Sequence, residues 1–275
     1  MKAFIIDLAR CSGCYNCQVA CKDEHCTNDW TPYAKPQPET GQFWLKIKEE
    51  ERGTLPKVRV SYTPVLCMHC RNAPCMEVCP IEGGIYRRED GLIVIDPKKC
   101  SGCRNCIDAC PYGCIYFNDG LHIAQKCTGC AHLLDRDDWQ QPRCADSCPT
   151  EALRIVDEEE AKDLIEKAEV LNPEFNTMPS VYYLNKPKKF IGGTVYNPEI
   201  KRIVKGATCT LTGSNGSFTA TTDGFGDFWF EDIEVDTYSL KIESEGYTTK
   251  IIDNINTKKD VNLGDIPFDK LTTSS

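Results

Sequence analysis

Cysteines are the residues of this chain whose type and spacing could do chemistry. The sequence has 19, and four groups of four account for all but three of them. The four quartets are Cys11, Cys14, Cys17 and Cys21; Cys67, Cys70, Cys75 and Cys79; Cys100, Cys103, Cys106 and Cys110; and Cys127, Cys130, Cys144 and Cys148. Thiols at this density form disulfides, bind zinc or hold iron–sulfur clusters.

The spacing within the quartets favours iron–sulfur clusters. An odd number of cysteines excludes full disulfide pairing within one chain, and structural zinc usually takes two pairs of ligands per ion. The first and third quartets follow the C-x2-C-x2-C-x3-C run of bacterial two-cluster ferredoxins, in which three cysteines hold one cluster and the fourth reaches another. We therefore predict [4Fe–4S] clusters, four by ligand count, or three if one site stays empty.

Composition excludes several other classes of protein. The formal net charge of −9 argues against nucleic-acid binding, and no apolar run is long enough for a membrane span. The N-terminal apolar stretch is short and interrupted by Asp7, unlike a secretory signal, so we expect a cytoplasmic protein. We find no Ser/His/Asp set, phosphate-binding loop or defined carboxylate pair, and we predict no catalytic site in this chain.

The elements that must position the quartets indicate an α+β protein of two regions. Residues 1–155 carry the quartets among short β-like runs, with a hairpin insertion at about 30–62. Residues 156–189 are expected to form a helix, over 157–170, and a linker. Residues 190–275 alternate short β-rich runs with Gly, Asn and Asp turns, which predicts a small all-β sandwich or barrel of about seven strands.

The cysteine-rich region resembles the four-cluster iron–sulfur subunits of the dimethyl-sulfoxide-reductase superfamily of molybdenum and tungsten enzymes. The matching stretches are 67–80, 90–113, 126–130 and 142–153. The resemblance implies nested ferredoxin-like lobes, quartets one and four in one lobe and two and three in the other. It implies these ligand sets: Cys11, Cys14, Cys17 and Cys148; Cys127, Cys130, Cys144 and Cys21; Cys67, Cys70, Cys75 and Cys110; Cys100, Cys103, Cys106 and Cys79.

The same resemblance implies an electron-transfer subunit. Its partner would be a large catalytic subunit that binds a bis(pyranopterin) molybdenum or tungsten cofactor, in a heterodimer or a higher oligomer. Residues 221–249 resemble a transthyretin-like or carboxypeptidase-regulatory-like domain. Quartets followed by such a domain are similar to the small subunits of anaerobic molybdenum transhydroxylases that convert pyrogallol to phloroglucinol. Another soluble molybdenum or tungsten oxidoreductase, a free-standing polyferredoxin and a subunit with purely structural clusters remain as alternatives.

Several further residues are candidates for supporting roles. Lysine and arginine beside the ligands could offset cluster charge, although ordinary surface charge is an equal alternative. These cations are Lys98, Lys99, Arg104 and Lys126. His69 either packs or donates to a cluster sulfur. The cysteines outside the quartets, Cys26, Cys114 and Cys209, are expected to be spare buried thiols.

Overall fold

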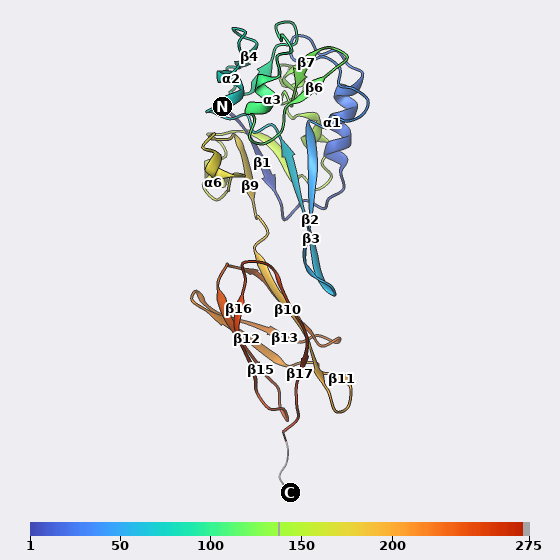
Figure 1. The fold of residues 1–275 in the computed structure, drawn as a ribbon, viewed down its shortest axis with the longest axis vertical. Helices are drawn as coiled ribbons and strands as arrows, with labels where there is room; N and C mark the ends of the chain where they lie inside the picture. Colours follow the sequence, from blue (N-terminus) through green and yellow to red (C-terminus); the bar gives the residue numbers. More distant parts are fainter. Residues whose placement is uncertain (137, 272–275) are drawn as a thin grey trace. The chain divides into compact units, whose positions relative to one another are not determined.

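Two parts of the chain pack separately in the computed structural model, which describes residues 1–136 and 138–271 (Figure 1). The first, here called the cluster unit, comprises Met1–Glu49 and Tyr62–Lys186. The second, here called the sandwich unit, comprises Glu50–Ser61 and the chain from Pro187 onward. All four quartets therefore belong to the cluster unit.

A three-stranded sheet of order β8-β1-β9 runs through the cluster unit. Strand β1 (Lys2–Asp7) pairs antiparallel with β8 (Leu153–Asp157) and parallel with β9 (Val181–Leu184). Residues 3–6 of β1 form a continuous apolar run and are all buried, as in a strand covered on both faces.

The quartets lie on short elements and on the loops between them. The longest helix is α1 (Asn16–Cys26), and the pairs β4–β5 and β6–β7 are hairpins of three-residue strands. The other short elements are α2 (Pro74–Glu77), β4 (Ile85–Arg87), β5 (Ile93–Ile95), α3 (Asn105–Ala109), β6 (Tyr116–Asn118), β7 (Ile123–Gln125), α4 (Ala131–Leu134), α5 (Arg143–Asp146), α6 (Lys162–Ile165) and the 3-10 helix η1 (Pro173–Phe175).

The segment expected as a helix and linker differs from the expectation. Residue 157 ends strand β8, where it is paired with Lys2, and only α6 is helical in the predicted stretch 157–170. The linker contains β9, whose Tyr183 is fully buried and donates its hydroxyl to the Pro64 carbonyl at 2.9 Å. Long-range pairing with β1 therefore places residue 157 and the segment Val181–Leu184 in strands, where the sequence pattern indicated a helix start and a linker.

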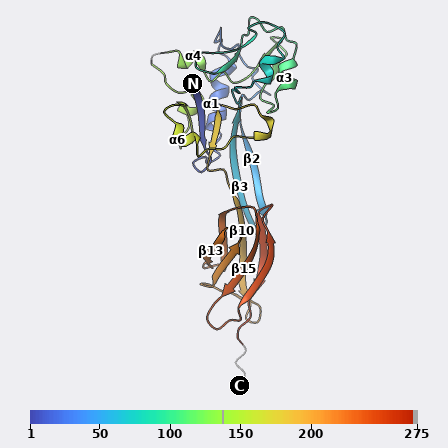
Figure 2. The same cartoon turned by 90° about the vertical axis from the view of Figure 1, so that its left-hand side faces the viewer.

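The sandwich unit contains two sheets that share one apolar core (Figure 2). In one sheet β10 is central, between β17 on one side and β14 with the short β11 on the other; the second has the order β13-β12-β15-β16. The strands are β10 (Lys189–Asn197), β11 (Arg202–Ile203), β12 (Thr208–Gly213), β13 (Gly216–Thr221), β14 (Asp227–Ile233), β15 (Thr237–Glu243), β16 (Lys250–Asn256) and β17 (Val261–Pro267). The expected all-β region is thus a β-sandwich.

The inserted hairpin supplies part of the sandwich unit. Its strands are β2 (Leu45–Thr54) and β3 (Lys57–Leu66), and its tip, Glu50–Ser61, groups with the sandwich. Arg52 makes a two-pronged ion pair with Asp260, at 2.9 and 2.7 Å, and both side chains are at most 10% exposed.

Two further cations of the hairpin tip contact the same sandwich. Lys57 is buried, pairs with Asp227 and lies over the Trp229 ring. Arg59 pairs with Glu231, and its guanidinium lies over the same ring, 4.1 Å from the ring centroid. The sequence did not predict that the tip would pack within the sandwich unit.

Across the described ranges, no helix has both the length and the apolar character that a membrane crossing requires.

The buried Arg52–Asp260 pair predicts a large effect of one conservative substitution. Asp260→Asn should lower the free energy of unfolding of the sandwich unit by about 3–5 kcal/mol, because it leaves a buried guanidinium without its counter-charge. Glu243→Gln is the matched control; its partner Lys241 is about half exposed, so the loss should stay below about 1 kcal/mol. Hydrogen-exchange mass spectrometry of sandwich peptides in urea measures both, and equal losses would contradict the prediction.

Candidate metal centres

A left-handed turn recurs inside three of the quartets. Gly13, Gly102 and Gly129 each precede the second cysteine, with φ of 68°, 73° and 66°. At Gly13 and Gly129 an added Cβ would lie 2.5 Å from Tyr62 and 2.6 Å from Leu92, so a side chain would be both strained and crowded. The turn aims a peptide N–H at the first cysteine: Gly129 donates to the Cys127 sulfur at 3.4 Å.

The second quartet has His69 where the others have glycine. Its φ is 44°, its side chain is fully buried, and its ring stacks on Phe4 with the centroids 5.8 Å apart. Nδ1 accepts a hydrogen bond from the Ile93 N–H at 3.0 Å, and burial holds the pKa of His69 well below its usual range. The ring is therefore neutral with its proton on Nε2, which has no hydrogen-bond partner within the described protein.

Two cavities in the cluster unit are each bordered by four cysteines. Cys67, Cys70, Cys75 and Cys110 line the first, here called site C. Cys79, Cys100, Cys103 and Cys106 line the second, here called site D. In each case three cysteines come from one quartet and the fourth from the other, which is the crossed grouping that the resemblance implied.

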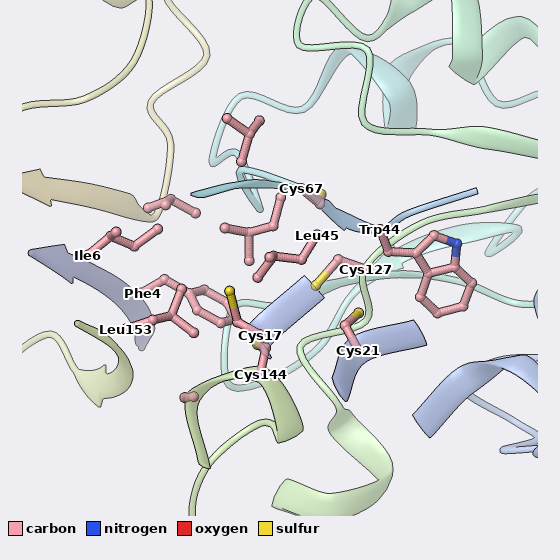
Figure 3. Packing of buried hydrophobic residues seen from close by; sticks show 14 of the residues in the cluster. Phe4, Ile6, Cys17, Cys21, Trp44, Leu45, Cys67, Cys127, Cys144 and Leu153 are labelled. Carbon is pink, nitrogen blue, oxygen red and sulfur yellow. The ribbon is translucent and has the colours of Figure 1, made fainter. Parts of the chain in front are cut away.

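The first and fourth quartets are interleaved in the same way. Cys11, Cys14, Cys17 and Cys148, here called site A, lie close enough to perturb one another electrostatically. Cys21, Cys127, Cys130 and Cys144, here called site B, form a second such group. Figure 3 shows members of both groups within the buried apolar core that contains Phe4 and Trp44. Helix α1 carries Cys17 and Cys21 and packs on α5, which carries Cys144.

The buried thiols are poor acids in the protein alone. Burial, reinforced by neighbouring sulfurs, raises the pKa of Cys17, Cys70 and Cys106 to about 12. Cys148 is an exception, because hydrogen bonds from Thr150, Leu153 and Ala152 outweigh burial and lower its pKa. Most of these sulfurs therefore need a bound cation to become thiolates.

The sites fit iron–sulfur clusters in shape and in chemistry. At site C and site D four sulfurs border a hollow, and peptide N–H groups donate to sulfurs of the quartets, as Ala124 does to Cys100 and Ala152 to Cys148, both at 3.3 Å. Such bonds stabilise the charge of a thiolate-bound cluster. Within the described residues no three His, Cys, Asp or Glu side chains are arranged to hold a single metal ion.

The four sites form a series. Cys17 of site A perturbs Cys144 of site B electrostatically, and Cys67 of site C perturbs Cys127 of site B in the same way. Site C meets site D through Cys75. The terminal sites each have one exposed cysteine, Cys14 in site A and Cys103 in site D.

Only one of the four candidate cations is buried. Lys98 and Lys99 are exposed, and Arg104 is paired with Asp119 at 2.9 Å and lies over Phe117. Lys126 is 2% exposed, and its Nζ donates to the carbonyls of Ile93 and Cys127. Burial alone would lower the pKa of Lys126, but the sulfurs of Cys67, Cys75 and Cys127 raise it above its ordinary value.

The cysteines outside the quartets behave largely as expected. Cys114 is buried, with its sulfur 3.2 Å from the Leu66 carbonyl, and Cys209 is fully buried in the sandwich core. Cys26 is only half buried, at the end of α1, which corrects the expectation for that thiol.

A histidine for which the sequence predicted no role lies beside site B. His25 is buried, and its Nε2 lies 3.7 Å from the Cys130 sulfur. It follows Cys17 and Cys21 at four-residue intervals, which places all three on one face of α1. That spacing was the signal that could have found it.

Comparison with known proteins identifies the relatives of this chain. Residues 58–158 match the 4Fe-4S dicluster domain family, and residues 191–266 match the carboxypeptidase regulatory-like domain family. The pyrogallol hydroxytransferase small subunit of Pelobacter acidigallici is 39% identical, over 94% of this chain and 96% of its own length. The chain belongs to the iron–sulfur subunits of the dimethyl-sulfoxide-reductase family of molybdoenzymes.

Other members of this family align over less of the chain. A tetrathionate reductase subunit of Salmonella typhimurium is 35% identical over 69% of this chain and 74% of its own length. A subunit of the anaerobic dimethyl sulfoxide reductase of Escherichia coli is 36% identical over 54% of this chain and 70% of its own. The solved structure of Klebsiella pneumoniae 5-hydroxyisourate hydrolase matches 29% of this chain and 90% of its own length, at 16% identity and a TM-score of 0.25, too low to support an argument.

The crossed grouping predicts different effects for two neighbouring cysteines. Cys110→Ser should remove one cluster and lower the iron content of the chain from about 16 to about 12, because Cys110 completes site C. Cys114→Ser, a buried thiol outside the sites, is the matched control and should keep all the iron. Iron analysis of anaerobically purified protein measures both, and a Cys110→Ser protein with full iron content would contradict the grouping.

Iron removal should affect the two units differently. Around site C and site D the core is small and is partly made of cysteines, whereas the sandwich has an apolar core of its own. Anaerobic removal of iron by ferricyanide and chelator should therefore abolish hydrogen-exchange protection in the cluster unit and leave it in the sandwich unit. Uniform loss of protection in both units would be the contrary result.

Proposed function

We propose that this chain is the iron–sulfur subunit of a molybdenum enzyme that transfers a hydroxyl group between polyhydroxybenzenes, as in the conversion of pyrogallol to phloroglucinol. The observation that carries the proposal is the extent of one alignment. The alignment with the pyrogallol hydroxytransferase small subunit covers 94% of the chain and so extends beyond the cluster unit into the sandwich unit. The alignments with the tetrathionate reductase and dimethyl sulfoxide reductase subunits cover 69% and 54%.

The proposal assigns a [4Fe–4S] cluster to each of the four sites. The ligands are those of site A, site B, site C and site D as defined above. Each cluster supplies one-electron transfer, and the serial contacts between sites support a relay whose ends lie at Cys14 and Cys103. One end would face the molybdenum cofactor of a large catalytic partner and the other a redox partner.

Hydroxyl transfer between two polyhydroxybenzenes involves no net electron exchange. The relay would therefore set the oxidation state of the partner's metal before turnover, rather than carry electrons in each cycle. This chain would contribute no group to the hydroxyl transfer itself.

Analysis of the native complex tests the proposal. Anaerobic purification through a tag on this chain should recover a large subunit with molybdenum, and this chain should hold about 16 iron. The complex should convert pyrogallol to phloroglucinol without added electron acceptor or donor once activated. Turnover that requires a stoichiometric acceptor would indicate another molybdenum oxidoreductase, and iron without molybdenum or tungsten would indicate a free-standing polyferredoxin.

A further inference from the structure

Lys126 differs from the other buried cations of the chain in what neutralises it. Lys57 and Arg52, which are also buried, each pair with a carboxylate, Asp227 and Asp260. No carboxylate pairs with Lys126 in the part of the chain that the structure describes. Lys126 is 2% exposed, and its ammonium group donates to two backbone carbonyls, those of Ile93 and Cys127.

A buried ammonium group needs an anion close by, because its desolvation is otherwise uncompensated. The ammonium group of Lys126 donates to the carbonyl of Cys127, a member of site B, and to that of Ile93, which lines site C. The sulfurs of Cys67 and Cys75 in site C and of Cys127 in site B act on its charge electrostatically. Lys126 therefore lies at the junction between the two middle sites of the series, where the anions available to it would be the thiolates and the negative charge of the bound clusters.

Two backbone carbonyls, those of Ile93 in β5 and of Cys127, fix the position of the ammonium group. The Ile93 carbonyl accepts from Lys126 Nζ, and the Ile93 N–H donates to His69 Nδ1. Ile93 is itself buried between these contacts. Both polar groups of one fixed residue are thus occupied, which leaves Lys126 little freedom to move away from the sulfurs.

We propose that Lys126 raises the reduction potentials of the clusters at site B and site C. The inference rests on the ligand sets of the proposed function. On reduction, one electron from an external donor converts a 2+ core to 1+, and the cluster with its four thiolates goes from about −2 to about −3. A fixed cation stabilises the more negative state more strongly, so it favours reduction of the two clusters that it touches.

The consequence is that the two middle clusters of the relay hold electrons better than they would without Lys126. The candidate cations near site D do not share this property, because Lys98 and Lys99 are exposed and Arg104 is paired with Asp119. Water screens such charges, and their effect on a cluster is correspondingly small.

Potentiometry on the complete complex tests the role of Lys126. Dithionite titration followed by electron paramagnetic resonance should show two of four clusters with lowered potentials in Lys126→Met. At the wild-type midpoint their oxidised-to-reduced ratio should rise at least about tenfold, which is about 59 mV for one electron. Lys126→Arg should restore the wild-type potentials, and Lys98→Met, the exposed control, should leave all four unchanged. Unchanged potentials in an iron-replete Lys126→Met complex would overturn the proposal.

A second measurement needs no substitution and applies if Lys126→Met fails to assemble. In the unmodified complex, labelled with ¹⁵N-lysine, pulsed electron paramagnetic resonance of the reduced clusters should detect a lysine nitrogen coupled to a cluster. Absence of any such coupling would overturn the placement of Lys126. An unmodified chain that holds no iron would instead overturn the proposed function, so the two failures are distinguishable.

Discussion

The grouping of thiols in fours is the constraint on which the cluster unit depends. Its helices and strands around site C and site D are three to five residues long, and such elements bury too little apolar surface to be stable alone. Cysteines also form part of the buried apolar cores of this unit. Burial suppresses ionisation of most of these thiols, so the bonds they make to iron would supply both the missing charge compensation and much of the missing cohesion.

The sandwich unit achieves stability by a different route. Its strands bury apolar residues from two sheets in one core, and the hairpin tip adds cations that pair with acids of the sandwich. Arg52 and Asp260 lie 208 positions apart in the sequence, yet both side chains are withdrawn from water. The β2–β3 hairpin thus contributes its base to the cluster unit, which depends on its cysteine sites. It contributes its tip to the sandwich unit, which depends on hydrophobic burial.

Local spacing in the sequence predicted more of the site than of the surrounding fold. The quartets and the all-β character of the C-terminal region are local patterns, while the crossed grouping required a family resemblance. The helix expected over 157–170 is confined to Lys162–Ile165, and its expected first residue instead ends strand β8, where it pairs with Lys2, 155 positions away. Lys126 is buried whereas Lys98 is exposed, and this difference could not be predicted from the neighbouring residues in the sequence. It depends on Ile93, whose carbonyl accepts a hydrogen bond from Lys126.

The hairpin tip also affects how this architecture could have been assembled from simpler chains. The chain passes between the two units at 49–50, 61–62 and 186–187, so the sandwich is not an appendage joined at a single point. A chain cut short at residue 190 would keep Arg52, Lys57 and Arg59 on the tip and lose Asp260, Asp227 and Glu231. Gain or loss of the sandwich during evolution therefore requires a matching change in the hairpin tip, more than a hundred residues upstream. Related chains should accordingly have both the tip and the sandwich or neither.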